Sequence, residues 1–418
     1  MTGGWDERVD AELEEIRAAG RWRVTREVVT SGPVTGEVDG RAVVTFASND
    51  YLGLTHHPDV VAAAHAALDR WGTGSGASRL IVGTRPAHTE LETELAAWKG
   101  TEAALLFPTG FAANLGLLAT LGRTDVTIVS DELNHASIVD GARLARASVR
   151  IFRHADLDHL AKVLIDVEAD PGAGGPVLVV TDSAFSMDGD VADIGALVDL
   201  CARHEALLVL DEAHAVLGPE VDVAQAAARG LTVLRMGTLS KALGSLGGFV
   251  AGPQRVIDLL RNRARPFIFT TAPTPADVAA GLAAVRIVRS DEGARLVARL
   301  RHHVDRVRPG HATPIVPVLL GTEEAALAAA ADLLDQGLLV PAIRPPTVPA
   351  GTSRLRIALS AAHTDDQIDR LAAALASLAS GPALPPSPGD PRGGIPPTTG
   401  VRPATSRPPT GPRGDQPT

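Results

Sequence analysis

Between residues 100 and 251, short apolar runs alternate with segments that have the periodicity of helices. The runs stand at 103–107, 126–129, 149–152, 177–181, 207–210, 231–236 and 248–251. Apolar runs this short, set between helices, are typical of strands that are buried on both faces. Strands that are connected through helices run parallel. The pattern therefore predicts an α/β fold with a mostly parallel central sheet and helices on both of its faces.

The segments on either side predict smaller units. Residues 5–23 have the pattern of an amphipathic helix, and a small β unit follows it. After long helices at 274–307, strand and helix patterns alternate up to residue 378, which predicts a smaller α+β domain. The last 38 residues hold 12 of the 30 prolines, which predicts a disordered tail rich in Pro and Gly. The expected parts are an N-terminal helix with a small β segment (1–54), a large domain (55–275), a small C-terminal domain (276–380) and the tail (381–418).

Charge and cysteine content narrow the class of protein. The net charge is −10, which argues against a broad nucleic-acid surface. Cys201 is the single cysteine, so the chain forms no internal disulfide. The N-terminus lacks the basic and apolar regions of a signal peptide, and no apolar stretch is as long as a membrane helix. We expect a soluble cytoplasmic protein that binds neither nucleic acid nor membranes.

Two ionisable residues follow predicted strands. Asp211 comes directly after the run 207–210, and Lys241 stands 30 residues later in the segment TLSKALG. Ligands of parallel sheets bind beyond the carboxyl ends of the strands. A carboxylate there holds a pyridine nitrogen protonated, and a lysine partly withdrawn from water loses its charge and forms an imine. Alone, Asp211 also fits a helix N-cap and Lys241 a surface lysine. Together they resemble the site of fold-type-I pyridoxal-phosphate (PLP) enzymes.

Other predicted strands end in polar loops at the same edge. Gly110 and Phe111 open a predicted helix, whose free N–H groups suit a phosphate. His135 and Ser186 also follow strands, where His135 has the shape to stack on a flat ring. Each loop alone is equally a plain strand-to-helix turn, but their convergence predicts one site.

These motifs identify a resemblance to the α-oxoamine synthase family over about residues 10–378. The matching segments are SNDYLGL (48–54), GSGASR (74–79), FPTGFAAN (107–114), LNHAS (133–137), FSMDGD (185–190), DEAH (211–214), TLSKALG (238–244) and IRPPTVPAGTSRLRIALSAAH (343–363). The resemblance implies an aminotransferase-like PLP enzyme of fold type I.

The resemblance also implies roles for single residues. The catalytic residues would be Lys241, which holds PLP as a Schiff base, Asp211, which pairs with the pyridine nitrogen, and His135, which stacks on the ring. The other residues implied to bind the cofactor are Gly110, Phe111, Ser186, His214, Thr238, Thr270 and Thr271, the last two reaching it from the second subunit of a homodimer with shared sites. Those implied to bind substrate are Arg23 (or else Arg21 or Arg26), His135, Thr347 and Arg356, of which Arg356 holds the amino-acid carboxylate through its bidentate fork.

The segment 343–363 is most similar to family members that condense L-alanine with a pimeloyl thioester, of CoA or of an acyl carrier protein, in biotin synthesis. Two alternatives stay open: a member that uses glycine or serine with another acyl-CoA, and an idle relative that acts as a binding protein. The glycine-rich segment 72–76 follows a predicted helix rather than a strand, which argues against a dinucleotide site. The histidines and the cysteine lack the spacing of metal ligands, so we expect no metal.

Overall fold

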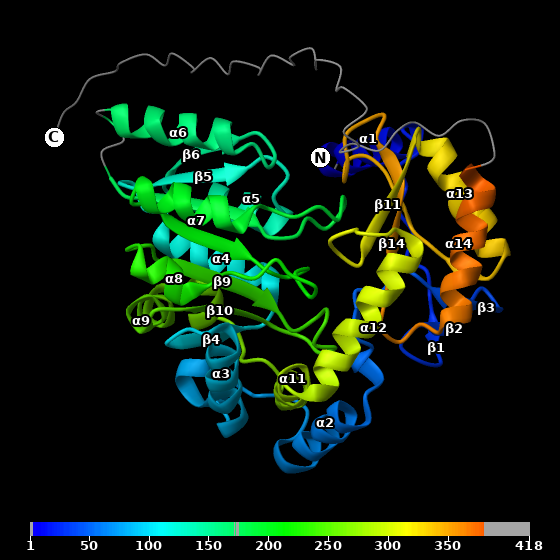
Figure 1. Ribbon diagram of the computed structural model, residues 1–418, viewed down its shortest axis with the longest axis horizontal. Helices are drawn as coiled ribbons and strands as arrows, with labels where there is room; N and C mark the ends of the chain where they lie inside the picture. The colour runs from blue at the N-terminus through cyan, green and yellow to red at the C-terminus, as the bar shows by residue number, and fades with distance from the viewer. Residues whose placement is uncertain (1–2, 171, 173–174, 380–418) are drawn as a thin grey trace.

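The structure is a computed structural model that describes residues 3–170, 172 and 175–379 (Figure 1). The predicted tail, 381–418, lies outside the described residues. None of the helices in the described part of the chain combines the length and the apolar character needed to cross a membrane.

A seven-stranded sheet forms the centre of the larger body, in the order β4-β10-β9-β8-β7-β5-β6. Its strands are β4 (Ala103–Phe107), β5 (Thr127–Asp131), β6 (Ser148–Phe152), β7 (Val177–Asp182), β8 (Leu207–Asp211), β9 (Val233–Thr238) and β10 (Gly248–Gly252). Strands β5 to β9 run parallel, and β10 is antiparallel to both β4 and β9. Each predicted apolar run overlaps one of these strands, so the mostly parallel sheet is confirmed.

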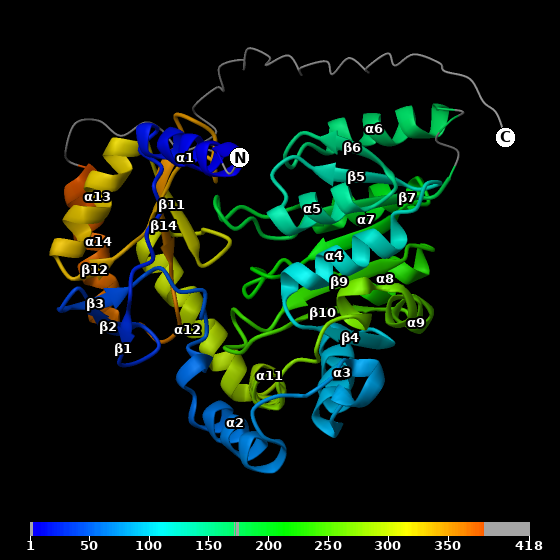
Figure 2. The same ribbon diagram turned by 180° about the vertical axis from the view of Figure 1, so that it is seen from behind.

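Helices cover both faces of this sheet, which explains why its strands are apolar throughout (Figures 1 and 2). In β8, Leu208 and Leu210 join one apolar cluster, while Val209 between them joins another. The first cluster contains residues of α6 (Leu157–Ala169), α7 (Ile194–Arg203) and α8 (Val223–Ala228). The second contains residues of α4 (Gly110–Leu121), α5 (Ala136–Leu144), α9 (Gln254–Arg263) and α10 (Arg265–Ile268).

A smaller body contains the C-terminal part of the described chain. Its three-stranded sheet has the order β11-β14-β13, from β11 (Ile315–Gly321), β13 (Ala342–Ile343) and β14 (Ser353–Ala358). Helices α12 (Asp291–Val307), α13 (Glu323–Asp335) and α14 (Asp365–Ala379) belong to it, and α11 (Pro275–Val288) precedes them. The prediction of a smaller C-terminal unit that contains both strands and helices is confirmed.

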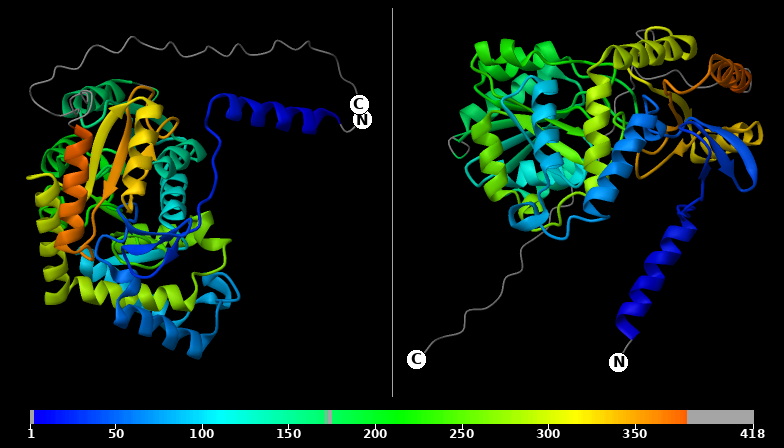
Figure 3. Two further views of the ribbon diagram at one scale, coloured as in Figure 1. Left: turned by 90° about the vertical axis from the view of Figure 1, so that its right-hand side faces the viewer. Right: turned by 90° about the horizontal axis from the view of Figure 1, so that it is seen from below.

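The N-terminal segment adds a second small sheet to that body. Strands β1 (Val29–Thr30), β2 (Thr35–Val38) and β3 (Arg41–Thr45) form an antiparallel unit, and β12 (Leu338–Leu339) pairs with β3 in parallel. Helices α2 (Pro58–Trp71) and α3 (Pro86–Lys99) then lead to the large sheet. Helix α1 (Gly3–Ala18) ends five residues before the predicted residue 23 and projects away from the rest of the chain (Figure 3).

Candidate active site

Loops at one edge of the large sheet enclose a cavity of about 230 Å³. The sequence-predicted residues that line it are Gly110, Phe111, His135, Asp211, His214, Thr238 and Lys241. They come from the ends of β4, β5, β8 and β9, so strand ends far apart in the sequence converge as parallel topology requires.

Asp211 ends β8 and is buried, with 2% of its surface exposed. Its Oδ1 accepts the backbone N–H of Ala213 at 2.9 Å, and its Oδ2 accepts the Asn114 amide at 2.8 Å. No helix begins directly after it, because α8 starts only at Val223, so the N-cap interpretation is wrong. Both carboxylate oxygens are thus held in place beside the cavity.

Lys241 lines the same cavity from the turn after β9. Burial lowers the pKa of Lys241, and the negative charges of Asp211 and Asp182 oppose that effect without cancelling it. A lysine with a lowered pKa gives up its proton more readily than an exposed lysine, and the free amine is both a nucleophile and a base. The carboxylate and the amine therefore face one cavity, as the sequence predicts.

A chain of hydrogen bonds connects Asp211 to His135. Asn114 donates from Nδ2 to Asp211 and also to the Ser137 hydroxyl, at 2.9 Å. The Ser137 hydroxyl lies 2.7 Å from His135 Nδ1, which also accepts the Ser137 backbone N–H. The acceptor role of Nδ1 places the proton of a neutral ring on Nε2. Asn114 and Ser137 stand in the segments FPTGFAAN and LNHAS, but neither was predicted to have a role.

The pKa values of both cavity histidines favour neutral rings. Burial lowers the pKa of His135; the charge of Asp211 opposes this, and that of Lys241 adds to it. Burial also lowers the pKa of His214 well below its usual value, helped by the positive charges of Lys241 and Arg356. Neutral imidazoles are available as hydrogen-bond partners and as flat apolar surfaces.

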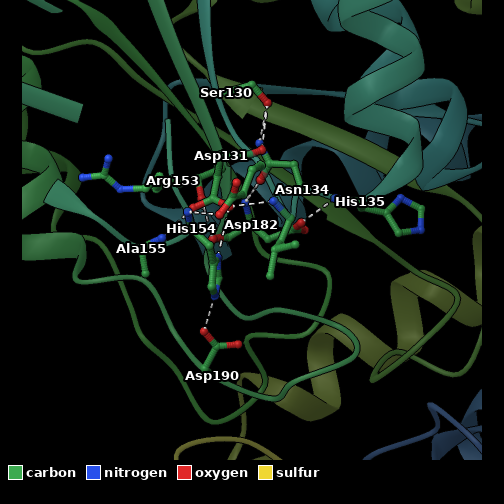
Figure 4. A network of polar contacts seen from close by, with 12 residues as sticks. Ser130, Asp131, Asn134, His135, Arg153, His154, Ala155, Asp182 and Asp190 are labelled. Atoms are coloured by element: carbon green, nitrogen blue, oxygen red, sulfur yellow. Dashed lines mark hydrogen bonds and ion pairs between the residues drawn. The ribbon is translucent and has the colours of Figure 1, made fainter. Parts of the chain in front are cut away.

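Beside His135, a network of polar contacts connects three loops of the sheet edge (Figure 4). The Asp182 carboxylate accepts the His135 backbone N–H at 2.7 Å. His154 lies between two carboxylates, 3.1 Å from Asp131 Oδ1 and 2.7 Å from Asp190 Oδ2. Burial lowers the pKa of His154, but the hydrogen bonds to Asp131 and Asp190 outweigh it and raise the pKa to about 10. The protonated ring therefore ties the β5 and β6 ends to the loop that holds Asp190.

The start of α4 provides a second polar wall. Thr109 caps the helix by accepting the Ala112 backbone N–H at 3.0 Å. The N–H groups of Gly110 and Phe111 belong to the first turn and have no acceptor within the helix. A Cβ on Gly248 would stand 2.5 Å from the Gly110 Cα and N, so only glycine lets β10 pass so close to this helix start. The Thr238 and Ser240 hydroxyls, 2.7 Å apart, complete the wall.

Arg356 lies on β14 of the smaller body and connects it to the cavity. It donates to the Ser186 backbone carbonyl and, at 3.1 Å, to Asn49 Oδ1. Tyr51 donates to the same Asn49 oxygen and lies 2.6 Å from His214 Nδ1. Asn49 and Tyr51 belong to the quoted SNDYLGL motif but were given no role. The Ser186 carbonyl contacts Arg356, and neither residue is among those that line the cavity.

Four predicted residues lie elsewhere in the single chain. Arg23 is exposed in the segment after α1, and its alternatives Arg21 and Arg26 face Glu323 and Asp39. Thr347 lines a different cavity, of about 730 Å³. Thr270 and Thr271 follow α10 and do not line the cofactor cavity of their own chain, so their role stays a prediction about a second subunit.

Comparisons with known proteins agree with this arrangement. The model of the aminotransferase class I and II family matches residues 41–375. An 8-amino-7-oxononanoate synthase of Anaeromyxobacter dehalogenans is 49% identical over 406 residues, covering 93% of this chain and 98% of that protein. One of Methylobacterium nodulans is 45% identical, over 90% of this chain and 98% of that protein. A solved serine palmitoyltransferase with PLP as an internal aldimine is 30% identical, with a TM-score of 0.81 over 91% of this chain and 98% of that one. The chain therefore belongs to the aminotransferase class I and II family and, within it, to the α-oxoamine synthases.

Proposed function

We propose that this chain catalyses the PLP-dependent decarboxylative condensation of L-alanine with a pimeloyl thioester, of CoA or of an acyl carrier protein. The products are 8-amino-7-oxononanoate, CO2 and the free thiol, in biotin biosynthesis. The observation that carries the proposal is the single cavity faced by the Lys241 amine, the Asp211 carboxylate and the His135 ring. Relatives that are 45% and 49% identical and bear the name of this synthase support the substrate pair.

The residues around the cavity fit PLP. Asp211 is a buried carboxylate for the pyridine nitrogen, His135 offers a flat face for the ring, and the Lys241 amine suits the aldehyde. At the other wall, the first-turn N–H groups of α4 and the Thr238 hydroxyl suit the phosphate. We assign His214 and Ser186 to the side of the phenolic oxygen. When bound, PLP supplies an electron sink for a carbanion at the amino-acid Cα.

The residues of this chain supply binding and proton transfer. Arg356 binds the alanine carboxylate through its planar fork, which fixes the orientation of the Cα–H bond. The neutral Lys241 Nζ takes the Cα proton as general base, since its lowered pKa favours the free amine. His135 donates Nε2–H to the oxygen of the thioester carbonyl as negative charge develops there.

The bonds balance across the reaction. A C–C bond forms between the alanine Cα and the acyl carbon, and the C–S bond breaks to release the thiolate, which takes one proton from solvent to become the thiol. The bond from Cα to the alanine carboxylate then breaks to release CO2, and Lys241 returns a proton to Cα. Each atom of the two substrates is therefore present in the aminoketone, the CO2 or the thiol.

We further propose a homodimer with shared sites, located in the cytoplasm. Support comes from a region of exposed apolar side chains beside Thr270 and Thr271: Phe269 is 70% exposed, and Ile81 and Val82 are 73% and 68% exposed. Apolar groups gathered at a surface favour a protein interface. Mixing inactive Lys241→Ala subunits with inactive Thr270→Val, Thr271→Val subunits should restore activity, because mixed dimers hold one intact site. Mixtures that stay inactive while exchanging subunits would refute shared sites.

A direct assay tests the reaction. Purified protein with PLP is incubated with pimeloyl-CoA and, in separate arms, L-alanine, glycine or L-serine, and CO2, free CoA and the aminoketone are measured. The proposal predicts stoichiometric products with alanine, and none with the Lys241→Ala variant. Preference for glycine or serine would assign the chain to another α-oxoamine synthase reaction, and no product in any arm would favour the idle relative.

A further inference from the structure

A second cavity, of about 730 Å³, lies between the loops of the large sheet and the smaller body. One wall contains Leu133, two residues before His135, and Met187, next to Ser186. The other wall contains Val348 and Arg354. Arg354 and Arg356 are two apart on β14 and therefore point to the same side of the strand. The second cavity is thus lined by close sequence neighbours of His135, Ser186 and Arg356.

With one exception, each basic side chain that lines this cavity has an ion-pair or close hydrogen-bond partner in the protein. Arg354 forms an ion pair with Asp188, and His154 is held by Asp131 and Asp190. Burial lowers the pKa of His311, and its Nε2 lies 2.6 Å from the Ile315 carbonyl. Arg308 is the exception: within the described residues (3–170, 172 and 175–379) it forms no ion pair with a carboxylate.

Arg308 follows α12, is half-buried, and lines this second cavity. Within the described residues, the only hydrogen-bond partner of its guanidinium is the Pro317 carbonyl, at 3.5 Å from Nη1, which is a weak contact. A guanidinium that is partly withdrawn from water without a counter-charge is unfavourable, and an anionic ligand removes that cost. The cavity therefore combines apolar side chains with one uncompensated positive charge.

We propose that this cavity binds the acyl chain of the thioester and that Arg308 binds the carboxylate at the far end of that chain. The assignment rests on the proposed function, because a pimeloyl group is a methylene chain that ends in a carboxylate. The methylenes match Leu133, Met187 and Val348, and the terminal charge matches Arg308. Thr347, predicted to contact substrate, lines the same cavity. Arg308 is thus a specificity-determining residue that distinguishes a carboxylate end from a methyl end.

The anion that Arg308 binds has a second potential source, which is a phosphate of the thiol carrier. The two sources differ in one respect that is easy to measure. A contact to the acyl carboxylate affects pimeloyl-CoA and not heptanoyl-CoA, which has the same chain length and a methyl end. A contact to the carrier affects both thioesters equally, because both carry the same CoA.

The experiment compares kcat/KM for pimeloyl-CoA and heptanoyl-CoA, with L-alanine saturating, in the PLP-loaded enzyme. The wild type should prefer pimeloyl-CoA, and Arg308→Met should reduce the preference about tenfold, entirely through pimeloyl-CoA. Arg308→Lys should keep part of the preference because it keeps the charge. Arg299→Met, on the exposed side of α12, is the matched control and should leave the ratio unchanged.

Each other result contradicts the assignment. Equal losses for both thioesters would place Arg308 at the carrier or in general folding, and a wild-type enzyme without a preference would leave Arg308 nothing to explain. In both of these cases alanine is still condensed, so the proposed function stands while the assignment falls. If the wild type condenses neither thioester, the proposed function itself fails, and the assignment fails with it.

Discussion

Asp182 and Asp211 are direct neighbours across the parallel strands β7 and β8, and both are buried. Burial and then the negative charge of Asp211 raise the pKa of Asp182 well above its usual value. Two adjacent carboxyl groups in a poorly solvated site do not both ionise readily. Asp182 therefore takes up a proton more readily than an exposed aspartate does.

The different environments of Asp211 and Asp182 predict that an Asp→Asn substitution affects PLP affinity unequally at the two positions. Asp211→Asn should weaken PLP binding by about 10- to 100-fold, because an amide does not hold a charged ring nitrogen. Asp182→Asn, the matched control, should change the affinity by less than about threefold, because an amide oxygen can still accept the His135 backbone N–H and the pKa of Asp182 is already raised towards the neutral form. Absorbance titration of the apoprotein with PLP measures both affinities. Equal losses in the two variants would show that Asp211 has no special charge role.

The Ser137 hydroxyl should affect turnover indirectly, by fixing the orientation of the His135 ring. Ser137→Ala removes the link between Asn114 and His135 Nδ1, so the ring should lose its fixed orientation. We expect kcat to fall about tenfold with little change in the KM for alanine, which is the effect of losing one positioning hydrogen bond. Ser148→Ala, at an exposed position of β6, serves as the control. An unchanged kcat in steady-state kinetics would contradict the proposal that His135 donates a hydrogen bond to the oxyanion.

The large sheet could be predicted from the sequence because each of its strands is an isolated apolar run between helices. The loops that carry Asp211, Lys241 and His135 were placed correctly because parallel strands bring their carboxyl ends to one edge. The antiparallel direction of β10 was not predicted, although the nine residues 239–247 between β9 and β10 are too few for a parallel crossover. Helix α1 also ends earlier than its amphipathic pattern indicated.

The supporting residues of the site were harder to predict than those that carry charge. Asn114 stands in the segment FPTGFAAN and Asp182 at the end of a predicted strand, but their roles depend on which side chain of a neighbouring strand lies opposite. Strand register supplies that information, as in the pairing of Asp182 with Asp211. Tyr51 depends on the packing of the N-terminal segment against His214, about 160 residues away in sequence. The sequence does offer one sign of such supporting residues, which is a polar residue within an otherwise apolar motif.

His154 should make the stability depend on pH in the alkaline range. Its folded pKa of about 10 lies above the value of about 6.5 for an unfolded histidine, so the folded chain binds the proton more tightly. The stabilisation is complete below about pH 6.5 and is lost as the pH rises through about 10. Thermal unfolding of His154→Gln should show a loss on the order of 2 kcal/mol near pH 6.5 that shrinks towards pH 10. His302→Gln, at an exposed position, should show no such trend.

The close approach of β10 to α4 predicts a cost for a single methyl group. In Gly248→Ala the new Cβ would stand 2.5 Å from the Gly110 backbone, so the helix start must shift. We expect a loss of about 1–3 kcal/mol in the free energy of unfolding, together with weaker PLP binding. Gly4→Ala, where nothing lies within 4 Å of the added Cβ, is the control for the measurement by denaturant unfolding. An unchanged PLP affinity in Gly248→Ala would indicate that the start of α4 does not bind the PLP phosphate.

The central claim is that the amine of Lys241 holds the cofactor, and the chain allows a direct test because it contains three lysines. Lys99 is buried in an ion pair with Glu212, and Lys162 is exposed. The protein is loaded with PLP, reduced with borohydride and digested, and the peptides are identified by mass spectrometry. The reduced pyridoxyl group should appear on Lys241 alone, whereas a label on Lys162 or Lys99, or on no lysine, would show that the Lys241 amine does not hold the cofactor.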